Sequence, residues 1–169
     1  NIGDFAFYSL HKFFPFEKGG LLIQNNPAIA PPKYSEIKLT HQLSLELIKY
    51  DVKTIVQKRK ENFKTLDNLI KNIPGIKPLK SMLDDDIPHN YPIIVEDGLR
   101  EKLYFWLIDK NITLIALYYR LIPPLQEERY LSMQKISDNI LNLPIHQDVN
   151  TEDLILLINY IKGFYEEQK

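Results

Sequence analysis

The chain of 169 residues contains no cysteine, which excludes disulfide bridges and thiolate metal sites and leaves its redox environment undetermined. It has no apolar run of the roughly 18 residues that a membrane-spanning helix needs, and it shows no signal-peptide pattern. The 21 basic and 22 acidic residues nearly cancel, so charge gives no reason to expect nucleic acid or an acidic membrane as a partner. We therefore expect a cytoplasmic protein.

Apolar residues are plentiful by contrast. With 44% hydrophobic and 11% aromatic residues the chain can bury a sizeable core, and its length suits one domain or parts of two. It starts at Asn1, without methionine, only a few residues before a predicted strand. We expect it to be the C-terminal half of a longer protein.

Residues 4–20 predict a strand, a loop that carries a lysine, and the start of a second strand. An apolar run ends at Ser9, Lys12 follows, and an aromatic and proline turn leads to the Gly19–Gly20 pair, after which residues 21–24 are again apolar. A lysine between aromatic side chains can be desolvated, which disfavours the ammonium form and frees the amine to attack a carbonyl. The alternative is an ordinary surface lysine.

The rest of the chain predicts helices and strands in alternation. Apolar residues at steps of three and four predict one long helix from about residue 37 to 72, and its charged run, residues 57–61, predicts a solvated face. The members of its apolar stripe are Leu45, Ile48, Val52, Ile55, Phe63, Leu66 and Ile70. Strands are expected at residues 76–79, 91–96, 112–119 and 140–145, and helices at 99–110, 127–138 and from Asn150 onward. This pattern predicts an α/β or α+β domain with helices packed on one sheet.

Several single residues refine these elements. Asp97 is expected to cap the helix at 99–110, and Asn150 the last helix, with Asp153 completing a variant of the capping box. Pro92 indicates an edge strand or a position near the start of a strand, because proline cannot donate to a ladder. The acidic run of residues 84–86 is not expected to bind metal, since three consecutive aspartates on an extended chain cannot all face one ion.

Three segments together resemble the DegT/DnrJ/StrS family of sugar aminotransferases, which depend on pyridoxal phosphate (PLP) and belong to fold type I. Ser9–Gly20 resembles its cofactor-lysine segment, Arg59–Gly75 its long helix, and Ile140–Gln147 its closing segment. The resemblance implies an α/β fold in which residues 1–50 are the remnant of the large PLP-binding domain. Residues 51–169 would then be the bridging helix and the small C-terminal domain.

The resemblance also implies the chemistry. Lys12 would bind the cofactor PLP covalently and then, once displaced, act as general acid and base. Ser9 is the expected phosphate ligand, although many members place a serine five residues before the lysine, where this chain has Phe7. His11 is either a supporting group or an ordinary loop histidine. The implied substrates are a nucleotide-sugar and glutamate, and the implied assembly is a homodimer. Residues 25–36 are shorter and richer in proline than the corresponding segment of the family. This departure puts in doubt whether the family's contacts between subunits apply to this chain.

Two further sites are candidates for substrate binding. Arg120 with Tyr118 and Tyr119 could bind a carboxylate or phosphate of the substrate, because guanidinium pairs with such groups through two hydrogen bonds. Tyrosines in the core and a surface arginine are the alternative. His146 ends a predicted strand at a position where the family also has histidine, and its role could equally be a structural hydrogen bond.

In this class of enzyme the carboxylate that pairs with the pyridine nitrogen lies upstream of the lysine. We therefore expect the 169-residue chain to show no transaminase activity by itself. Two other functions stay open: a PLP-dependent sugar dehydratase of the same family, and a non-catalytic module whose apolar faces pack against a partner.

Overall fold

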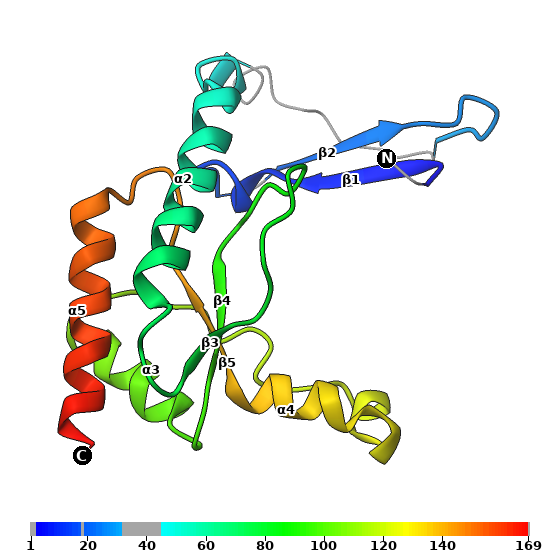
Figure 1. The fold of residues 1–169 in the computed structure, drawn as a ribbon. Coiled ribbons are helices and arrows are strands. Elements are labelled where there is room, and N and C mark those ends of the chain that lie inside the picture. The colour runs from blue at the N-terminus through cyan, green and yellow to red at the C-terminus, as the bar shows by residue number, and fades with distance from the viewer. Residues whose placement is uncertain (1–2, 18, 32–44, 169) are drawn as a thin grey trace. The chain divides into compact units, whose positions relative to one another are not determined.

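A computed structural model describes residues 3–17, 19–31 and 45–168 (Figure 1). The chain divides into two compact units, Asn1–Val52 and Lys53–Lys169. The assignment of these parts to a large and a small domain stays a prediction. Among the described residues, no helix is long and apolar enough to cross a membrane.

The first unit is built on a β-hairpin. Strands β1 (Phe5–Ser9) and β2 (Gly20–Gln24) pair antiparallel, and the 3-10 turn η1 (Leu10–Lys12) opens the loop between them. Gly19 has a φ of 121°, and a Cβ added to Gly20 would lie 2.9 Å from the Phe7 ring. The backbone conformation of Gly19 therefore favours glycine where the chain re-enters the hairpin, and at Gly20 a side chain would have to displace the Phe7 ring. The predicted strand, lysine loop and strand are confirmed.

The long helix is shorter than predicted. Helix α2 spans Val52–Ile70, and residues 48–51 before it are not helical. Residues 37–44 of the prediction lie outside the described part of the chain. The C-terminal part of the predicted apolar stripe is buried, namely Ile55, Phe63, Leu66 and Ile70. Its N-terminal part is exposed, because the turns end the helical repeat that would have aligned Leu45 and Ile48 with it.

The second unit contains a three-stranded antiparallel sheet in the order β3-β4-β5, with β3 at Ile76–Pro78, β4 at Tyr91–Val95 and β5 at Ile140–Leu143. Pro92 lies in the central strand, against the expectation of an edge, but near its start as also expected. The Pro92 carbonyl accepts from the Leu79 amide at 3.0 Å, just beyond the end of β3. A residue's N–H and C=O point to the same side of a strand, so the N–H that Pro92 lacks would have faced Leu79, beyond the end of β3. Its absence therefore removes no hydrogen bond between β3 and β4.

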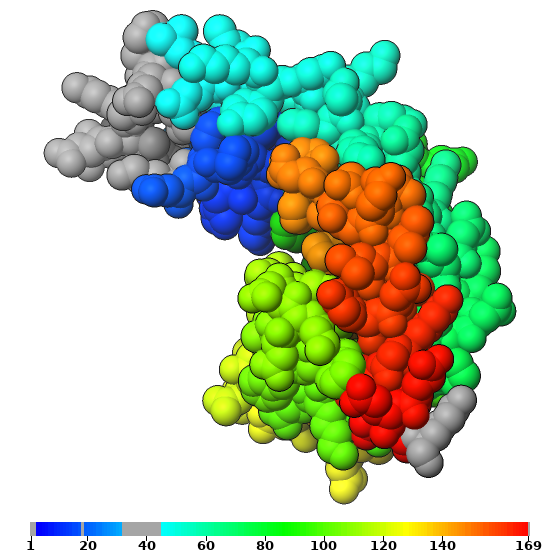
Figure 2. All heavy atoms as spheres, turned by 90° about the vertical axis from the view of Figure 1, so that its left-hand side faces the viewer, coloured from blue at the N-terminus to red at the C-terminus, as the bar shows by residue number. Residues whose placement is uncertain are grey.

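Helices α3 (Arg100–Asp109) and α5 (Thr151–Glu167) join α2 on one side of this sheet (Figure 1). In Figure 2, α5 faces the viewer and α3 lies beside it. The strand side chains that face these helices are buried, as Tyr91, Ile93 and Val95 of β4 illustrate. Helix α4 (Leu131–Asn139), after the short turns η2 (Pro123–Gln126) and η3 (Glu128–Tyr130), leads into β5. Helices packed on one sheet were predicted and are confirmed.

The predicted strand at 112–119 is wrong. Within it only Ile115 forms an isolated bridge, to Asn142 of β5. The Asn142 side chain donates to the carbonyls of Ile115 and Leu117, both at 2.9 Å. Two backbone bonds form the bridge itself, at 3.0 and 3.4 Å. Beyond it, the Leu117 carbonyl binds the Asn142 side chain, and a sequence rich in β-branched and aromatic residues stays irregular.

The two predicted caps have opposite outcomes. Asn150 caps α5, its side chain accepting from the Asp153 amide at 2.8 Å while the Asp153 carboxylate accepts from the Asn150 amide at 3.0 Å. Asp97 does not cap α3. It has a φ of 59°, in the left-handed region, and Leu99 is the residue that precedes the helix. An N-cap needs an extended backbone, which Asp97 lacks in its turn with Gly98.

Candidate functional site

The lysine loop is shaped by the backbone of Leu10. This residue is buried, its amide donates to the Gly19 carbonyl at 3.1 Å, and its carbonyl accepts from the amides of Phe13 and Phe14 at 3.0 and 2.9 Å. These bonds fold the chain back immediately after β1. Lys12 is therefore held at the end of a tight turn, close in sequence and space to the strand that ends at Ser9.

The predicted enclosure of Lys12 by aromatic side chains is not found. Lys12 and His11 are exposed, whereas Ser9 is half-buried opposite Gly20 in the hairpin. The aromatic residues of the loop pack on one another and on Tyr50, with ring centroids 5.3 Å apart for the Phe14–Tyr50 pair. These tilted and edge-on contacts occupy the aromatic rings that the sequence predicted as walls around the lysine.

The lysine loop offers two of the groups that PLP needs. An accessible primary amine can bond to an aldehyde carbon, and a hydroxyl three residues earlier can accept or donate at a phosphate. Lys12 and Ser9 supply this pair on one turn. The loop residues fit covalent attachment and one phosphate contact, and no partner for the pyridine nitrogen is identified among the described residues.

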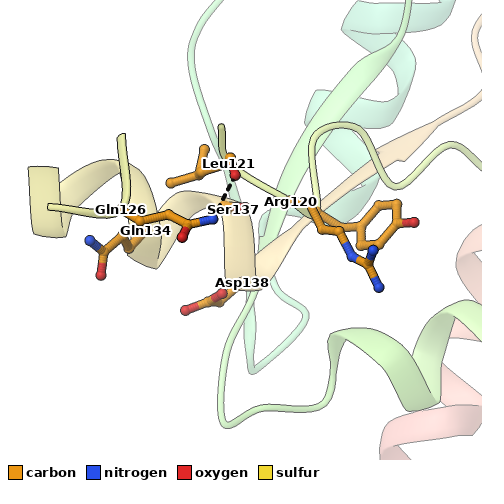
Figure 3. A pocket seen from close by; sticks show the side chains of 7 residues that line it. Arg120, Leu121, Gln126, Gln134, Ser137 and Asp138 are labelled. Carbon is orange, nitrogen blue, oxygen red and sulfur yellow. Dashed lines mark hydrogen bonds between the residues drawn. The ribbon is translucent and has the colours of Figure 1, made fainter. Parts of the chain in front are cut away.

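Arg120 lines a cavity of about 330 Å³ in the second unit (Figure 3). The other lining residues are Tyr119, Leu121, Gln126, Gln134, Ser137 and Asp138. The guanidinium carbon lies 5.5 Å from the centre of the Tyr119 ring, a cation–π contact. Tyr118 does not line this cavity. Its side chain is 70% exposed, and its carbonyl accepts from the buried Ser137 hydroxyl at 2.7 Å.

The cavity beside Arg120 presents mainly acceptors. The amide nitrogen of Gln126 donates to the Leu121 carbonyl at 2.8 Å, and that of Gln134 to the Glu127 carbonyl at 3.2 Å. Their side-chain oxygens, with the exposed Asp138 carboxylate, are left to accept from a ligand. Figure 3 shows the two glutamines at one end and Arg120 at the other. Such a lining suits a ligand that has hydroxyl or amino groups and an anionic group.

His146 lies elsewhere. It is exposed on the turn after β5, and its Nδ1 is 3.4 Å from an Asp148 carboxylate oxygen. It lines a separate cavity of about 400 Å³, together with Lys110, Tyr160 and part of α5. The structure therefore does not bring the three predicted substrate residues into one cavity.

Two residues that sequence reasoning placed on a solvated face or left without a role are buried on α2. Arg59 is 3% exposed and Asn62 is 1% exposed. Arg59 donates from Nε and a terminal nitrogen to the Gln147 side-chain oxygen, at 3.1 and 3.0 Å, and contacts His89 Nδ1 at 3.3 Å. Burial lowers the pKa of Arg59, and the nearby Asp148 carboxylate opposes this shift. The expected solvated face is thus wrong at Arg59.

Asn62 acts on the same turn. Its amide nitrogen lies 3.2 Å from the carbonyl of His146 and 2.9 Å from that of Val149, with Ile145 at 3.4 Å. The spacing of Arg59 and Asn62, three residues apart on a helix, could have revealed a shared face. The long-helix segment and the closing segment of the sequence are therefore joined by side-chain hydrogen bonds.

Both of these joined segments lie within a match to a known family. Residues 44–162 match the DegT/DnrJ/EryC1/StrS aminotransferase family. The chain belongs to this family. The DegT/DnrJ/EryC1/StrS match includes Arg59, Asn62, Arg120 and His146, while Lys12 precedes it. No curated protein sequence matches the chain.

Solved structures confirm the predicted α/β fold of this DegT/DnrJ/EryC1/StrS chain. Spr1654 from Streptococcus pneumoniae, in its PMP form, has a TM-score of 0.72 at 18% identity, covering 99% of this chain and 54% of its own. DesV from S. venezuelae has 0.69 at 17%, covering 97% and 52%. PseC of Helicobacter pylori, an aminotransferase involved in the biosynthesis of pseudoaminic acid, has 0.59 at 22%, covering 74% and 36%. The chain thus spans about a third to a half of these structures.

Proposed function

We propose that this chain carries the cofactor lysine and the C-terminal portion of a PLP-dependent aminotransferase that transfers an amino group to a ketone of a sugar or nucleotide-sugar. The observation that carries this proposal is the fold match to Spr1654, solved also in a PLP form, over 98% of the chain at a TM-score of 0.72. That match extends beyond the family segment to the part of the chain that contains Lys12. Family membership supports the same reaction class.

In this reaction PLP, when bound, supplies the electron sink that makes the substrate's α-carbon proton acidic. Lys12 Nζ would hold the cofactor through its aldehyde carbon. Once released, the same amine would carry a proton between the donor's α-carbon and the cofactor's C4′. The Ser9 hydroxyl would bind the phosphate, and His11 beside the lysine would support it. Glutamate is the proposed amino donor and a homodimer the proposed assembly.

We assign the sugar substrate to the second unit. Arg120 would pair with a phosphate of a nucleotide-sugar, because a guanidinium binds such a group through two hydrogen bonds. The acceptor oxygens of Gln126, Gln134 and Asp138 in the same cavity would suit sugar hydroxyls. Tyr118 and His146 would add contacts from outside that cavity, since neither of them lines it.

The test uses the whole aminotransferase loaded with PLP. Adding glutamate should convert the cofactor to its aminated form, which is followed by absorbance, and Lys12→Ala should abolish the conversion. Lys64→Ala, an exposed lysine on α2, is the matched control and should behave as wild type. The 169-residue chain alone should give no turnover, because it spans about half of Spr1654. Cofactor conversion that persists in Lys12→Ala would contradict the proposal, and the absence of conversion in the wild type would favour a non-catalytic module.

A further inference from the structure

The turn of residues 145–149 is held by side chains more than by its own backbone. One backbone bond, from the Val149 amide to the His146 carbonyl at 3.0 Å, closes it. Asn62 reaches the carbonyls of His146 and Val149, and Arg59 donates twice to the Gln147 side chain. Two helix residues thus fix a turn that lies more than eighty positions later in the chain.

The burial of the Arg59 guanidinium costs free energy that a purely structural contact would not require. Removing a guanidinium from water has a large desolvation cost, which apolar side chains of the same volume would avoid. The donors are satisfied, so the cluster is not unfavourable as built, but an apolar contact would serve a purely structural purpose as well. The hydrogen bonds add what an apolar contact cannot, namely a defined direction for the backbone carbonyls of the turn.

The turn presents two exposed polar groups. His146 and Asp148 point outward on either side of Gln147, with Nδ1 and Oδ2 3.4 Å apart, and both line the cavity of about 400 Å³. The residue between them, Gln147, is the one that Arg59 binds. The backbone orientation that fixes Gln147 inward therefore directs its two neighbours outward.

We propose that Arg59 and Asn62 are positioning residues for His146, and that they act on substrate binding through the turn of residues 145–149. This inference rests on the proposed function, which gives His146 a contact with the sugar substrate. Neither α2 residue touches the substrate. Their contribution is to hold the imidazole in the orientation in which it meets the ligand.

The first test measures the turn itself, in this chain, by amide hydrogen exchange. Asn62→Ala should speed exchange of the Val149 amide at least tenfold while buried amides of α3 keep their protection. Asn68→Ala, on an exposed part of the same helix, is the matched control and should leave Val149 unchanged. Equal protection of Val149 in Asn62→Ala and the wild type would overturn the inference.

The second test measures kinetics of the whole aminotransferase. Asn62→Ala should raise KM for the sugar substrate about tenfold with a smaller change in kcat, and should have no further effect in a His146→Ala background. A merely structural defect would lower kcat by reducing the folded fraction, would leave KM unchanged, and would add to the effect of His146→Ala. Additive effects would therefore overturn the positioning role.

A gentler pair of variants covers the case in which Asn62→Ala does not fold. Gln147→Ala removes the acceptor of Arg59 and should raise KM, whereas Gln147→Glu keeps an acceptor oxygen and should restore it. Failure of Gln147→Glu to restore KM would contradict the inference. If His146→Ala itself leaves KM unchanged, the substrate role proposed for His146 is wrong, whatever the turn does.

Discussion

The two units use apolar residues in opposite ways. In the hairpin, Phe7 is 72% exposed and Leu21 49%, although both lie on strands. In the second unit, Tyr91 and Leu141 on neighbouring strands are fully buried beneath helices. A two-stranded hairpin has too little surface to bury its own side chains, whereas three strands covered by helices form a core. Stability thus resides in the second unit, while the proposed reactive amine lies in the first.

The largest expected effect is a difference in the free energy of unfolding between two leucine-to-alanine variants, one in each unit. Leu66→Ala removes a fully buried side chain and should lower the free energy of unfolding by about 2 to 5 kcal/mol. Leu22→Ala, at a 38% exposed position of the hairpin, should change it by about 0.5 kcal/mol or less. Urea unfolding followed by the single tryptophan, Trp106, measures both. Equal losses would show that the hairpin shares the core after all.

The next effect concerns the turn between α2 and β3. Gly75 has a φ of 77°, and a Cβ there would lie 2.8 Å from the Tyr165 ring. Gly75→Ala should therefore destabilise the second unit by about 1 to 3 kcal/mol. Gly163→Ala is the matched control. It lies within α5 with open space around it, and alanine should stabilise the helix by about 0.5 to 1 kcal/mol. A neutral Gly75→Ala would contradict the account of this turn.

A smaller effect depends on pH. The Tyr165 hydroxyl donates to the Gly75 carbonyl at 3.2 Å, and burial, with Asp97 and Glu96 nearby, raises the pKa of Tyr165 to about 12. The unfolded chain loses this proton at about pH 10. Stability is therefore fully present below pH 10 and falls between about pH 10 and 12, by on the order of 1 kcal/mol.

Tyr165→Phe should flatten this loss. Some loss will remain, because burial and the hydrogen bond to Asp67 also raise the pKa of Tyr91. Urea unfolding at several pH values measures the slope. A slope that Tyr165→Phe leaves unchanged would contradict the role assigned to this tyrosine.

Much of the fold follows from local signals. The Asn150 cap and the glycine pair of the hairpin depend on a few neighbouring residues, and the structure confirms both. The predicted strand at 112–119 failed because its hydrogen bonds depend on Asn142, far away in the sequence. The predicted cap at Asp97 was wrong because the left-handed backbone of its turn, which the side-chain type does not reveal, keeps this residue from capping α3.

The candidate site was less accessible to sequence reasoning. Lys12 could be found by its place between two strands, but its exposure could not, since the aromatic residues beside it were free to pack on Tyr50 instead. Arg59 and Asn62 were missed because charged and amide side chains on a helix are mostly solvated. Their partners in the turn of residues 145–149 lie more than eighty positions away, beyond the reach of a local pattern.

The proposed function depends on a covalent bond between the Lys12 amine and PLP, which reduction and peptide mapping can detect. The whole aminotransferase is incubated with PLP, reduced with borohydride, and digested for peptide mapping. We expect one equivalent of reduced cofactor on Lys12, and little on exposed lysines such as Lys64 and Lys102. Label spread evenly over these lysines, or label that persists at full stoichiometry in Lys12→Ala, would contradict it.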